Sequence, residues 1–450
     1  MNWRKTAYLS YASLRGYRFP SLLLARLREY ERGIELDTVA HSLSQLLQHC
    51  RNGVPYYAEL LDEAGVRRID GEDPRACLQR LPILTKEIIR KNISRLQSKD
   101  LHARKWHHNT SGGSTGEPIQ LVQDAEYDDH SAAIGLFYNS LLGCEVGEPV
   151  VRLWGSERDL EGGTKSRKAR FFNWLTNTTW LNAFLMSPER MVQFVQTLNR
   201  LRPRLIVAYA QAAYELARFA ERERISVTPQ RAVLTSAGTL YPFMRDQIAT
   251  VFGCEVYNLY GSREVSDIAC ELPGLEGLWV APWNNFVEIV DDAGHPVPPG
   301  AEGNILVTSL TNYAMPLLRY AIGDRGALLP DNTLVEQPGT QVLQRVSGRN
   351  VDMFRTRDQT LIDGEYFTHL LYFRPWIRTF QVVQTASERI LFKCVRANGG
   401  PTRSELEDIT AKVRLVMGAD CRVDFEFPGH LPPLPSGKYR YTISEVGGPN

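Results

Sequence analysis

The chain has 450 residues, of which 43% are hydrophobic and 23% are charged. This length exceeds one ordinary hydrophobic core and is about that of three average domains, and the composition is globular. A disordered chain, a collagen and a coiled-coil rod are therefore excluded. Lys and Arg number 52 against 51 Asp and Glu, so the net charge is +1. A protein that binds nucleic acid by neutralising phosphates normally has a basic excess, and none is present overall.

Hydropathy and cysteine patterns favour a reduced, metal-poor, cytoplasmic protein without stable membrane insertion. The apolar runs, such as residues 22–24, are far shorter than the roughly 18 residues that span a bilayer. Residues 1–19 contain no apolar stretch of signal-peptide length. The seven cysteines are scattered and form no C-x-x-C pair, which argues against a disulfide scaffold or a zinc knuckle.

Helices are the first elements expected along the chain. Residues 36–62 carry apolar side chains at helical spacing, interrupted at Gly53-Val54-Pro55, and predict a pair of helices. The stretch TKEIIRKNI, after Pro82, predicts another short helix.

The middle of the chain alternates short β-branched runs with helical stretches. The expected strands are residues 150–154, 204–209, 231–236 and 254–260, and the expected helices are residues 211–224 and 242–252. Strands of about six residues that alternate with helices of about a dozen predict a parallel sheet with crossover helices. Ligands bind beyond the carboxyl ends of such strands, so the loops TSAG and LYGSRE are expected on that rim.

After about residue 280 the pattern predicts antiparallel β structure, and past residue 352 it predicts a compact unit. There FQVVQT and ILFKCV would form a hairpin, and VDFEF would be the final strand. Between them a helix would start at Ser404, with Glu407 completing a capping box, and end at Gly418. The expected fold class is α/β, with a large N-terminal domain (1–351) and a small C-terminal α+β domain (352–450).

A loop rich in glycine and hydroxyl groups, residues 110–116, is the first motif that indicates chemistry. Its backbone would wrap an anion and its hydroxyls would bind it, although a flexible surface loop is the ordinary alternative. The serine hydrolase elbow is a second alternative, with Ser114 as nucleophile. That elbow needs an apolar strand before the serine and a helix after it, whereas residues 106–109 are largely polar and Pro118 follows. No Gly-Lys-Ser/Thr follows at Walker spacing.

Four further motifs follow, and each alone is more often an ordinary turn. In the segment 257–264, Tyr260 offers a ring face for a base and Glu264 could hold a hard cation such as magnesium. Asp324, after a glycine, could accept hydrogen bonds from a ribose diol. The segment 348–352 lies at the junction of the two expected domains. The segment 434–440 presents one lysine on a loop.

In this order and spacing the five motifs resemble the adenylate-forming enzyme superfamily. The greatest similarity is to the phenylacetate-CoA ligase family and its CapK-like branch, from about residue 45 to residue 445. The resemblance implies ATP and Mg²⁺ as cofactors, with coenzyme A as a possible second substrate. The residues that it places around ATP are Thr110, Ser111, Gly112, Gly113, Ser114, Thr115 and Gly116 at the phosphates, Ser236, Ala237, Gly238 and Tyr260 at the adenine, and Asp324 and Arg349 at the ribose, with Gly261 beside Tyr260 allowing the chain to turn tightly.

The resemblance also assigns two catalytic residues and a hinge. Glu264 would bind magnesium, Lys438 would bridge the substrate carboxylate and the α-phosphate, and Asp352 would be the hinge of the small domain. Arg263 and Thr239 depart from the pattern, since the wider superfamily usually has Thr at the first position and many relatives have Glu at the second. Some relatives carry a zinc cluster, but here Cys270 has no cysteine neighbours and Trp279 occupies the expected histidine position, so we expect no zinc.

The implied reaction is the ATP- and Mg-dependent activation of a carboxylic acid as acyl-AMP, followed by transfer to a thiol of coenzyme A or a carrier. The CapK-like resemblance permits an alternative acceptor, the amine or hydroxyl of a sugar or other metabolite. Two alternatives come from other classes: a serine hydrolase, and an inactive nucleotide-binding homologue suggested by Arg263 and Thr239. No nucleic-acid partner is expected, and the acid is not identified.

Overall fold

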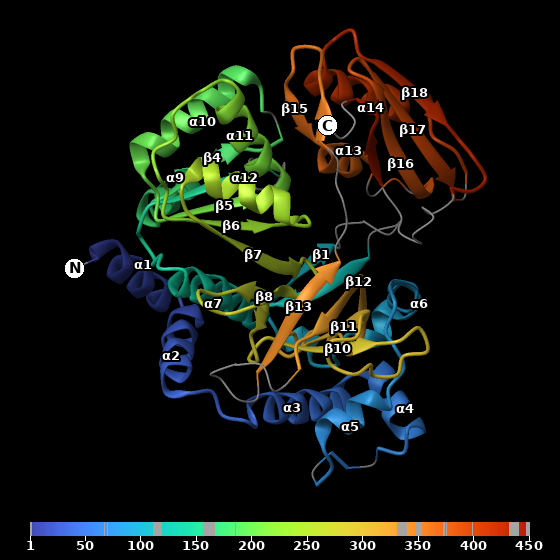
Figure 1. The fold of residues 1–450 in the computed structure, drawn as a ribbon. Helices are drawn as coiled ribbons and strands as arrows, with labels where there is room; N and C mark the ends of the chain where they lie inside the picture. Colours follow the sequence, from blue (N-terminus) through green and yellow to red (C-terminus); the bar gives the residue numbers. More distant parts are fainter. Residues whose placement is uncertain are drawn as a thin grey trace. The chain divides into compact units, whose positions relative to one another are not determined.

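The structure is a computed structural model (Figure 1). It describes all residues except 1, 67, 70, 111–118, 156–166, 185, 331–339, 348–352, 372, 373, 375, 398, 432–440 and 447–450. The described part of the chain contains no helix with the length and hydropathy of a membrane span. Its residues form two compact units. The first contains the described residues of Met1–Gly112, Ile119–Val146 and Tyr257–Gly348, and the second those of Gly147–Val256 and Arg349–Asn450.

The first unit combines helices with an antiparallel sheet. Its helices are α1 (Trp3–Leu14), α2 (Phe19–Arg32), α3 (Thr38–Gly53), α4 (Pro55–Glu63), α5 (Pro74–Gln79), α6 (Lys86–Leu96), η1 (Leu101–Ala103) and α7 (Ala125–Leu141). Its strands are the hairpin β1 (Trp106–Thr110) and β2 (Gln120–Asp124), followed by β7 (Glu255–Ser262), β8 (Ser266–Glu271), β9 (Leu278–Val280), β10 (Asn285–Val290), β11 (Gly303–Ser309), β12 (Tyr320–Leu328) and β13 (Gln341–Ser347).

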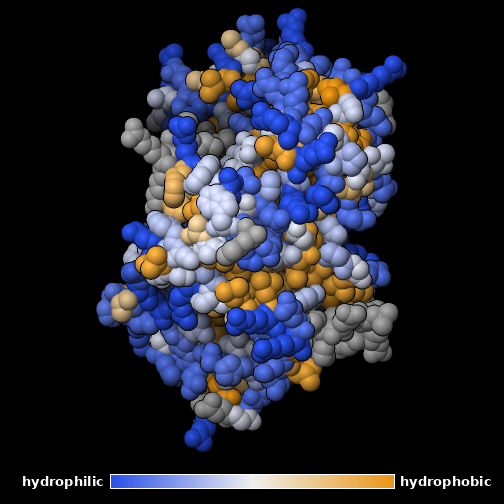
Figure 2. All heavy atoms as spheres, turned by 90° about the vertical axis from the view of Figure 1, so that its left-hand side faces the viewer, coloured by the Kyte–Doolittle hydropathy of each residue, from blue (hydrophilic) through white to orange (hydrophobic). Residues whose placement is uncertain are grey.

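Strands β7 to β13 follow the spatial order β10-β11-β12-β13-β9-β8-β7, and every neighbouring pair in this order is antiparallel. A buried apolar cluster packs the four helices α3, α4, α5 and α6 against this sheet. The face that carries α1 and α2 mixes hydrophobic and hydrophilic side chains (Figure 2). The antiparallel structure expected after residue 280 and the helical pair expected over residues 36–62 are both confirmed.

The second unit begins with a parallel α/β layer. Its strands are β3 (Val150–Trp154), β4 (Thr178–Asn182), β5 (Leu205–Tyr209) and β6 (Ala232–Ser236), in the order β6-β5-β3-β4. Its helices are α9 (Arg167–Leu175), α10 (Pro188–Leu201), α11 (Ala210–Arg222) and α12 (Pro242–Phe252). Local sequence sets these limits, because Ser187 caps α10 and Gly253 ends α12 in the left-handed conformation, with φ 61°. The predicted parallel sheet is confirmed for β3, β5 and β6. Strand β4 was not predicted, and the fourth predicted strand, residues 254–260, is β7, which pairs antiparallel with β8.

The second unit ends with a small α+β part. Its elements are β14 (Met353–Arg355), β15 (Leu361–Asp363), α13 (Gly364–Leu371), β16 (Ile377–Ala386), β17 (Arg389–Arg396), α14 (Arg403–Met417), β18 (Arg422–Glu426) and β19 (Thr442–Ser444). The spatial order β18-β17-β16-β19 combines the predicted hairpin with two parallel pairs. The expected class, α/β with a smaller C-terminal part, is confirmed.

Two local predictions for this part were wrong. The capping box of α14 is formed by Thr402 and Glu405, not by Ser404 and Glu407, because the earlier pair completes both reciprocal bonds. The helix does end at Gly418, as expected. The strand that contains VDFEF is not the last, because β19 adds beside β16 after it.

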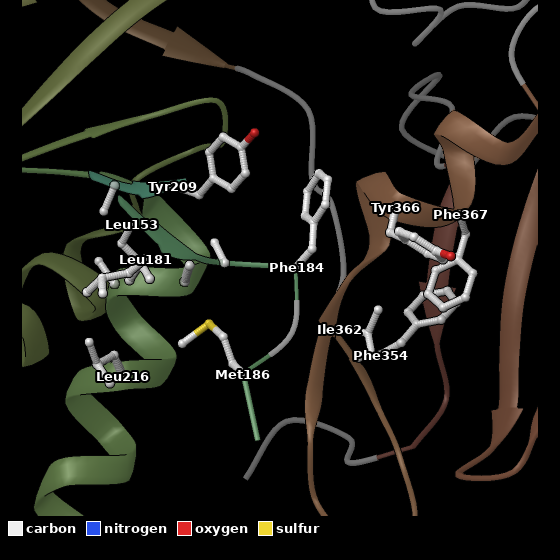
Figure 3. Packing of buried hydrophobic residues seen from close by; sticks show 14 of the residues in the cluster. Leu153, Leu181, Phe184, Met186, Tyr209, Leu216, Phe354, Ile362, Tyr366 and Phe367 are labelled. Atoms are coloured by element: carbon white, nitrogen blue, oxygen red, sulfur yellow. The ribbon is translucent and has the colours of Figure 1, made fainter. Parts of the chain in front are cut away.

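Aromatic side chains join the two parts of the second unit in one buried cluster (Figure 3). The ring of Phe184, after β4, meets Tyr366 of α13 edge-on, with the centroids 6.3 Å apart. Phe354 of β14 stacks on Phe367 at 4.6 Å. The packing around Phe184 requires glycine at position 155, because a Cβ there would lie 2.7 Å from the Phe184 ring.

A buried pair of basic side chains joins α2 to α7 in the first unit. The Arg26 guanidinium lies 2.6 Å from His130 Nδ1 and donates to the His130 carbonyl oxygen at 3.2 Å. It also lies over the Trp283 ring, 5.7 Å from the centroid. Burial, with the nearby Arg26 and Arg18, lowers the pKa of His130 to about 3, so the ring accepts from Arg26 in its neutral form.

We expect this pair to weaken the fold in acid. An unfolded histidine has a pKa of about 6.5, so the stability that neutral His130 contributes is complete above about pH 6.5 and is lost as pH falls toward 3. One group of this kind lowers the free energy of unfolding by at most about 1.4 kcal/mol per pH unit in that window. His130→Gln keeps an acceptor for Arg26 and should flatten the slope, measured by urea unfolding across the window. His295→Gln, which replaces an exposed histidine, serves as control. Equal slopes of unfolding free energy against pH in the wild type and both variants would contradict the assignment to His130.

Candidate functional site

Glu264 has two polar neighbours in the first unit. It follows β7, and its side chain is 7% exposed. The hydroxyl of Tyr320, the first residue of β12, donates to Glu264 Oε1 at 3.2 Å. The ammonium of Lys86, whose side chain is 12% exposed, lies 3.9 Å from the same oxygen. A carboxylate is thus held largely out of water by one hydroxyl and one cation.

Lys86 reaches Glu264 because the chain before α6 docks on the start of β12. Leu84 donates from its N–H to the carbonyl oxygen of Arg319 at 3.1 Å, and its own carbonyl accepts from Ala321 at 3.0 Å. Strand β13 pairs with β12 only from Arg325 onward. The main chain at the start of β12, around Tyr320, is therefore available to Leu84. Thr85 then caps α6, and Lys86 is its first residue.

Tyr260 and Asp324, which the sequence assigned to the same nucleotide, are in contact. The Tyr260 hydroxyl donates to Asp324 Oδ2 at 2.9 Å, which links β7 to β12. Gly261 comes next, at an irregularity in the pairing of β7 with β8. A Cβ on Gly261 would lie 2.8 Å from the Ser266 carbonyl oxygen and 3.0 Å from Asp267 Cα, so only glycine permits this approach.

The hairpin β1–β2 brings the start of the glycine-rich loop to the same place. Gln123 donates to the carbonyl oxygens of Arg263 at 3.0 Å and Glu264 at 3.4 Å, and Asn109 donates to Gln123 at 2.7 Å. Thr110 ends β1 directly after Asn109. The first three motifs therefore meet in one unit, at Thr110, residues 260–264 and Asp324.

Two hydroxyl oxygens near these contacts are buried without a hydrogen-bond partner among the described residues. They are Oγ1 of Thr110 and Oγ of Ser262. An unpaired buried hydroxyl costs about 1–3 kcal/mol, so both oxygens are positions where a ligand or a water would complete the bonding. Both belong to the segments that the sequence assigned to phosphate and base.

The remaining predicted residues lie elsewhere. Ser236 is the last residue of β6 in the second unit, and Ala237 and Gly238 follow it. Ala237 has a left-handed backbone with φ 59° that is unusual for a residue other than glycine. The predicted residues outside the described part of the chain are Ser111, Gly112, Gly113, Ser114, Thr115, Gly116, Arg349, Asp352 and Lys438. Their roles stay predictions.

The sequence analysis missed two side chains that contact Glu264. Lys86 lies in the TKEIIRKN stretch and Tyr320 precedes the Gly-Asp motif, but neither received a role. The signal available for Lys86 was the helix start at Thr85. The N-terminus of a helix carries partial positive charge, so a lysine in the first turn is repelled there and is stabilised by an acidic partner from another segment. Only the fold identifies that partner as Glu264.

Glu264 and its surroundings could hold a magnesium ion of the kind that binds together with a nucleotide. No group of three or more His, Cys, Asp or Glu side chains arranged to hold a metal occurs among the residues that the structure describes. Magnesium in nucleotide sites commonly takes one or two carboxylates and completes its shell with phosphates and water, so a single Glu264 is sufficient. Cys270 lies opposite Trp279 in the register of β8 and β9, and the expected absence of zinc stays a prediction.

The chain is similar to known proteins over most of its length. Residues 354–445 match the CapK C-terminal domain family. Over 430 residues the chain is 24% identical to protein CapK of Staphylococcus aureus, covering 94% of this chain and 92% of CapK. It is also 28% identical over 313 residues to the phenylacetate-coenzyme A ligase of Thermus thermophilus, covering 63% of each.

A solved structure shares the fold of the chain. A structure of 2-hydroxyisobutyryl-CoA ligase with 2-HIB-AMP and CoA in the thioesterification state matches with a TM-score of 0.57 at 18% identity, covering 93% of this chain and 91% of that one. The chain has the fold of the adenylate-forming ligases. The resemblance stated from the motifs and the expected enzyme class, an adenylate-forming ligase, are thereby confirmed.

We expect Tyr320→Phe to destabilise the first unit. The variant leaves the buried Glu264 carboxylate without its hydroxyl donor and should lower the free energy of unfolding by about 1–3 kcal/mol. Tyr17→Phe removes an exposed hydroxyl and should change it by less than about 0.5 kcal/mol. Denaturant unfolding measures both. Equal effects of the two variants would mean that the Tyr320–Glu264 bond adds nothing to the fold.

Proposed function

We propose that this adenylate-forming ligase activates a carboxylic acid with ATP and passes the acyl group to a thiol, that of coenzyme A or a carrier. Three hydrogen bonds together carry the proposal. The Tyr260–Asp324 bond at 2.9 Å and the two bonds from Gln123 to the carbonyl oxygens of residues 263 and 264 bring three separate motifs together. Similarity to phenylacetate-coenzyme A ligases, at 24% identity over 345 residues for that of Aromatoleum evansii, supports the thiol acceptor.

In the first proposed step a carboxylate oxygen attacks the α-phosphorus of ATP, the bond to the bridging oxygen breaks, and pyrophosphate leaves. Two anions approach one another, so the site must supply positive charge where charge develops. Lys438 would provide it at the carboxylate and α-phosphate. Lys86, buried beside Glu264, would provide a second cation near the phosphates. Thr110 and Ser262 would donate hydroxyl groups.

The nucleotide would be held by the contacts already present in the first unit. Asp324 accepts from Tyr260 through Oδ2, and a carboxylate can accept further hydrogen bonds, here from the ribose with the help of Arg349. Fixing the Tyr260 hydroxyl also fixes the ring that would lie against the adenine. Glu264 would hold magnesium, which neutralises phosphate charge when it is bound with ATP.

In the second step the thiolate attacks the acyl carbon of the adenylate and AMP leaves with the electron pair of the broken bond. We propose that residues 352–450 rotate as a small domain about Asp352 between the two steps, which removes Lys438 from the site. Domain closures of this kind take microseconds to milliseconds.

An amine or hydroxyl acceptor is the second candidate, and the match to CapK favours it. CapK is similar over nearly the whole chain, and the C-terminal residues 354–445 match the CapK C-terminal domain family, whereas the ligase matches are shorter. The first half-reaction is identical in both candidates. The proposals differ only in the nucleophile that attacks the acyl carbon.

We expect carboxylate-dependent exchange of pyrophosphate into ATP, with Lys438 as the discriminating residue. Removing one donor of this kind typically slows a reaction by about 10²–10³. Lys438→Ala should slow exchange by that order while leaving the melting temperature unchanged, and transfer from supplied acyl-AMP should survive. Lys412→Ala, which removes an exposed lysine on α14, is the matched control. Normal exchange by Lys438→Ala would contradict the assignment, and absence of exchange across a broad acid panel would favour the inactive or hydrolytic alternatives.

A product assay separates the two acceptors. With a productive acid, the thiol proposal expects thioester only when coenzyme A or a carrier thiol is present, and no acyl transfer to an amine or amino sugar. Mass spectrometry of products with and without coenzyme A measures this. An amide or ester formed at full rate without any thiol would establish the second candidate.

A further inference from the structure

Exposed hydrophobic side chains are concentrated in the two helices α1 and α2 and their surroundings. Among the described residues, ten large hydrophobic side chains are exposed, and five of them lie within residues 3–36. They are Trp3, Leu14, Tyr17, Leu24 and Leu36. Leu14 is 87% exposed, the highest of the ten. Single exposed apolar side chains are ordinary, but their concentration in one short segment marks an interaction site.

Positive charge is concentrated in the same segment. Residues 1–36 contain seven Lys and Arg and three Glu, a net charge of +4 in a chain of net charge +1. The rest of the chain is therefore net negative. Arg15, Arg28 and Arg32 are exposed, whereas Arg26 is buried with His130 and serves the fold. Lys5 and Arg18 form ion pairs with Glu145 and Glu126 of other segments, so Arg15, Arg28 and Arg32 are the cations that matter here.

The fold places these side chains outward. In α2 the side chains of Phe19, Leu23 and Arg26 are buried, and those of Leu24 and Arg28 are exposed one turn apart on the opposite face. The turn between α1 and α2 exposes every residue from Leu14 to Arg18. We call Trp3, Leu14, Arg15, Tyr17, Leu24 and Arg28 the α1–α2 surface. The face of the molecule that carries these helices shows hydrophobic and hydrophilic groups side by side (Figure 2).

We propose that the α1–α2 surface docks the protein on an anionic lipid bilayer. Trp, Tyr and Leu side chains enter the boundary between headgroups and acyl chains, while arginines contact the phosphates and acidic headgroups beside them. A protein partner would instead require a contiguous apolar centre from which charges are depleted. Here Arg15 stands between Leu14 and Tyr17 in the exposed turn, and Arg28 stands one helical turn from Leu24, an arrangement that fits a fluid, negatively charged surface.

The proposal is independent of the proposed function, because none of its residues belongs to the candidate site. The experiment is flotation of the full chain with phosphatidylcholine vesicles, with and without phosphatidylglycerol. We expect the protein to float with the anionic vesicles, to remain unbound with the neutral ones, and to be released by high salt as screening weakens the charge attraction. Binding that is equal for both vesicles, or absent from both, would overturn the proposal.

Variants test whether this surface carries the binding. Arg15→Gln with Arg28→Gln should weaken binding by about fivefold per arginine, and Leu14→Ser by about tenfold or more. The matched controls are Leu415→Ser and Arg403→Gln, which remove an exposed leucine and an exposed arginine on α14. Pyrophosphate exchange and melting temperature should stay unchanged in all variants. A wild-type oligomer in solution that Leu14→Ser converts to a monomer would assign the surface to a second copy and overturn the proposal.

Discussion

The buried guanidinium of Arg319 is the contact on which the candidate site depends. Its Nε lies 3.2 Å from Glu288, and its Nη1 donates to the carbonyl oxygens of Gln79 and Leu81 at 3.1 and 2.6 Å. These bonds tie the chain before α6 to the start of β12. The backbone of Arg319 is left-handed, with φ 50°, a conformation that costs of order 1–3 kcal/mol in a residue other than glycine. Charge-assisted bonds offset that cost, and the two neighbours of Glu264 meet as a consequence.

The contacts around Glu264 and Asp324 lie within one unit, which has a consequence for the proposed rotation. Tyr260, Glu264, Asp324 and Lys86 all belong to the first unit, so their mutual contacts do not depend on where residues 352–450 lie. A rotation of residues 352–450 would instead break the apolar contact between Phe184 and Tyr366 in the second unit and replace it with another. Apolar packing is not directional, so it can be exchanged for another apolar contact more readily than a buried polar network.

The order of the elements and part of the site were predictable from the sequence. The parallel strands, the hairpin at residues 377–396 and the helix that ends at Gly418 all follow from periodicity and turn residues. The capping box was misplaced by two residues because Ser404 and Thr402 both fit the pattern locally. The strand β19 was missed because three residues give no periodic signal, and its place beside β16 is set by the rest of the sheet.

The sequence by itself determined the order of the motifs, and their resemblance to those of adenylate-forming enzymes predicted which residues serve the site. It predicted Tyr260, Glu264 and Asp324 as members of one site before any contact was known. Only the tertiary structure decided that Tyr260 donates to Asp324 and that Lys86, far away in the sequence, lies beside Glu264. The physical reason is that a motif is a local pattern, whereas a contact between distant segments depends on how the strands pair and on which buried polar groups find partners.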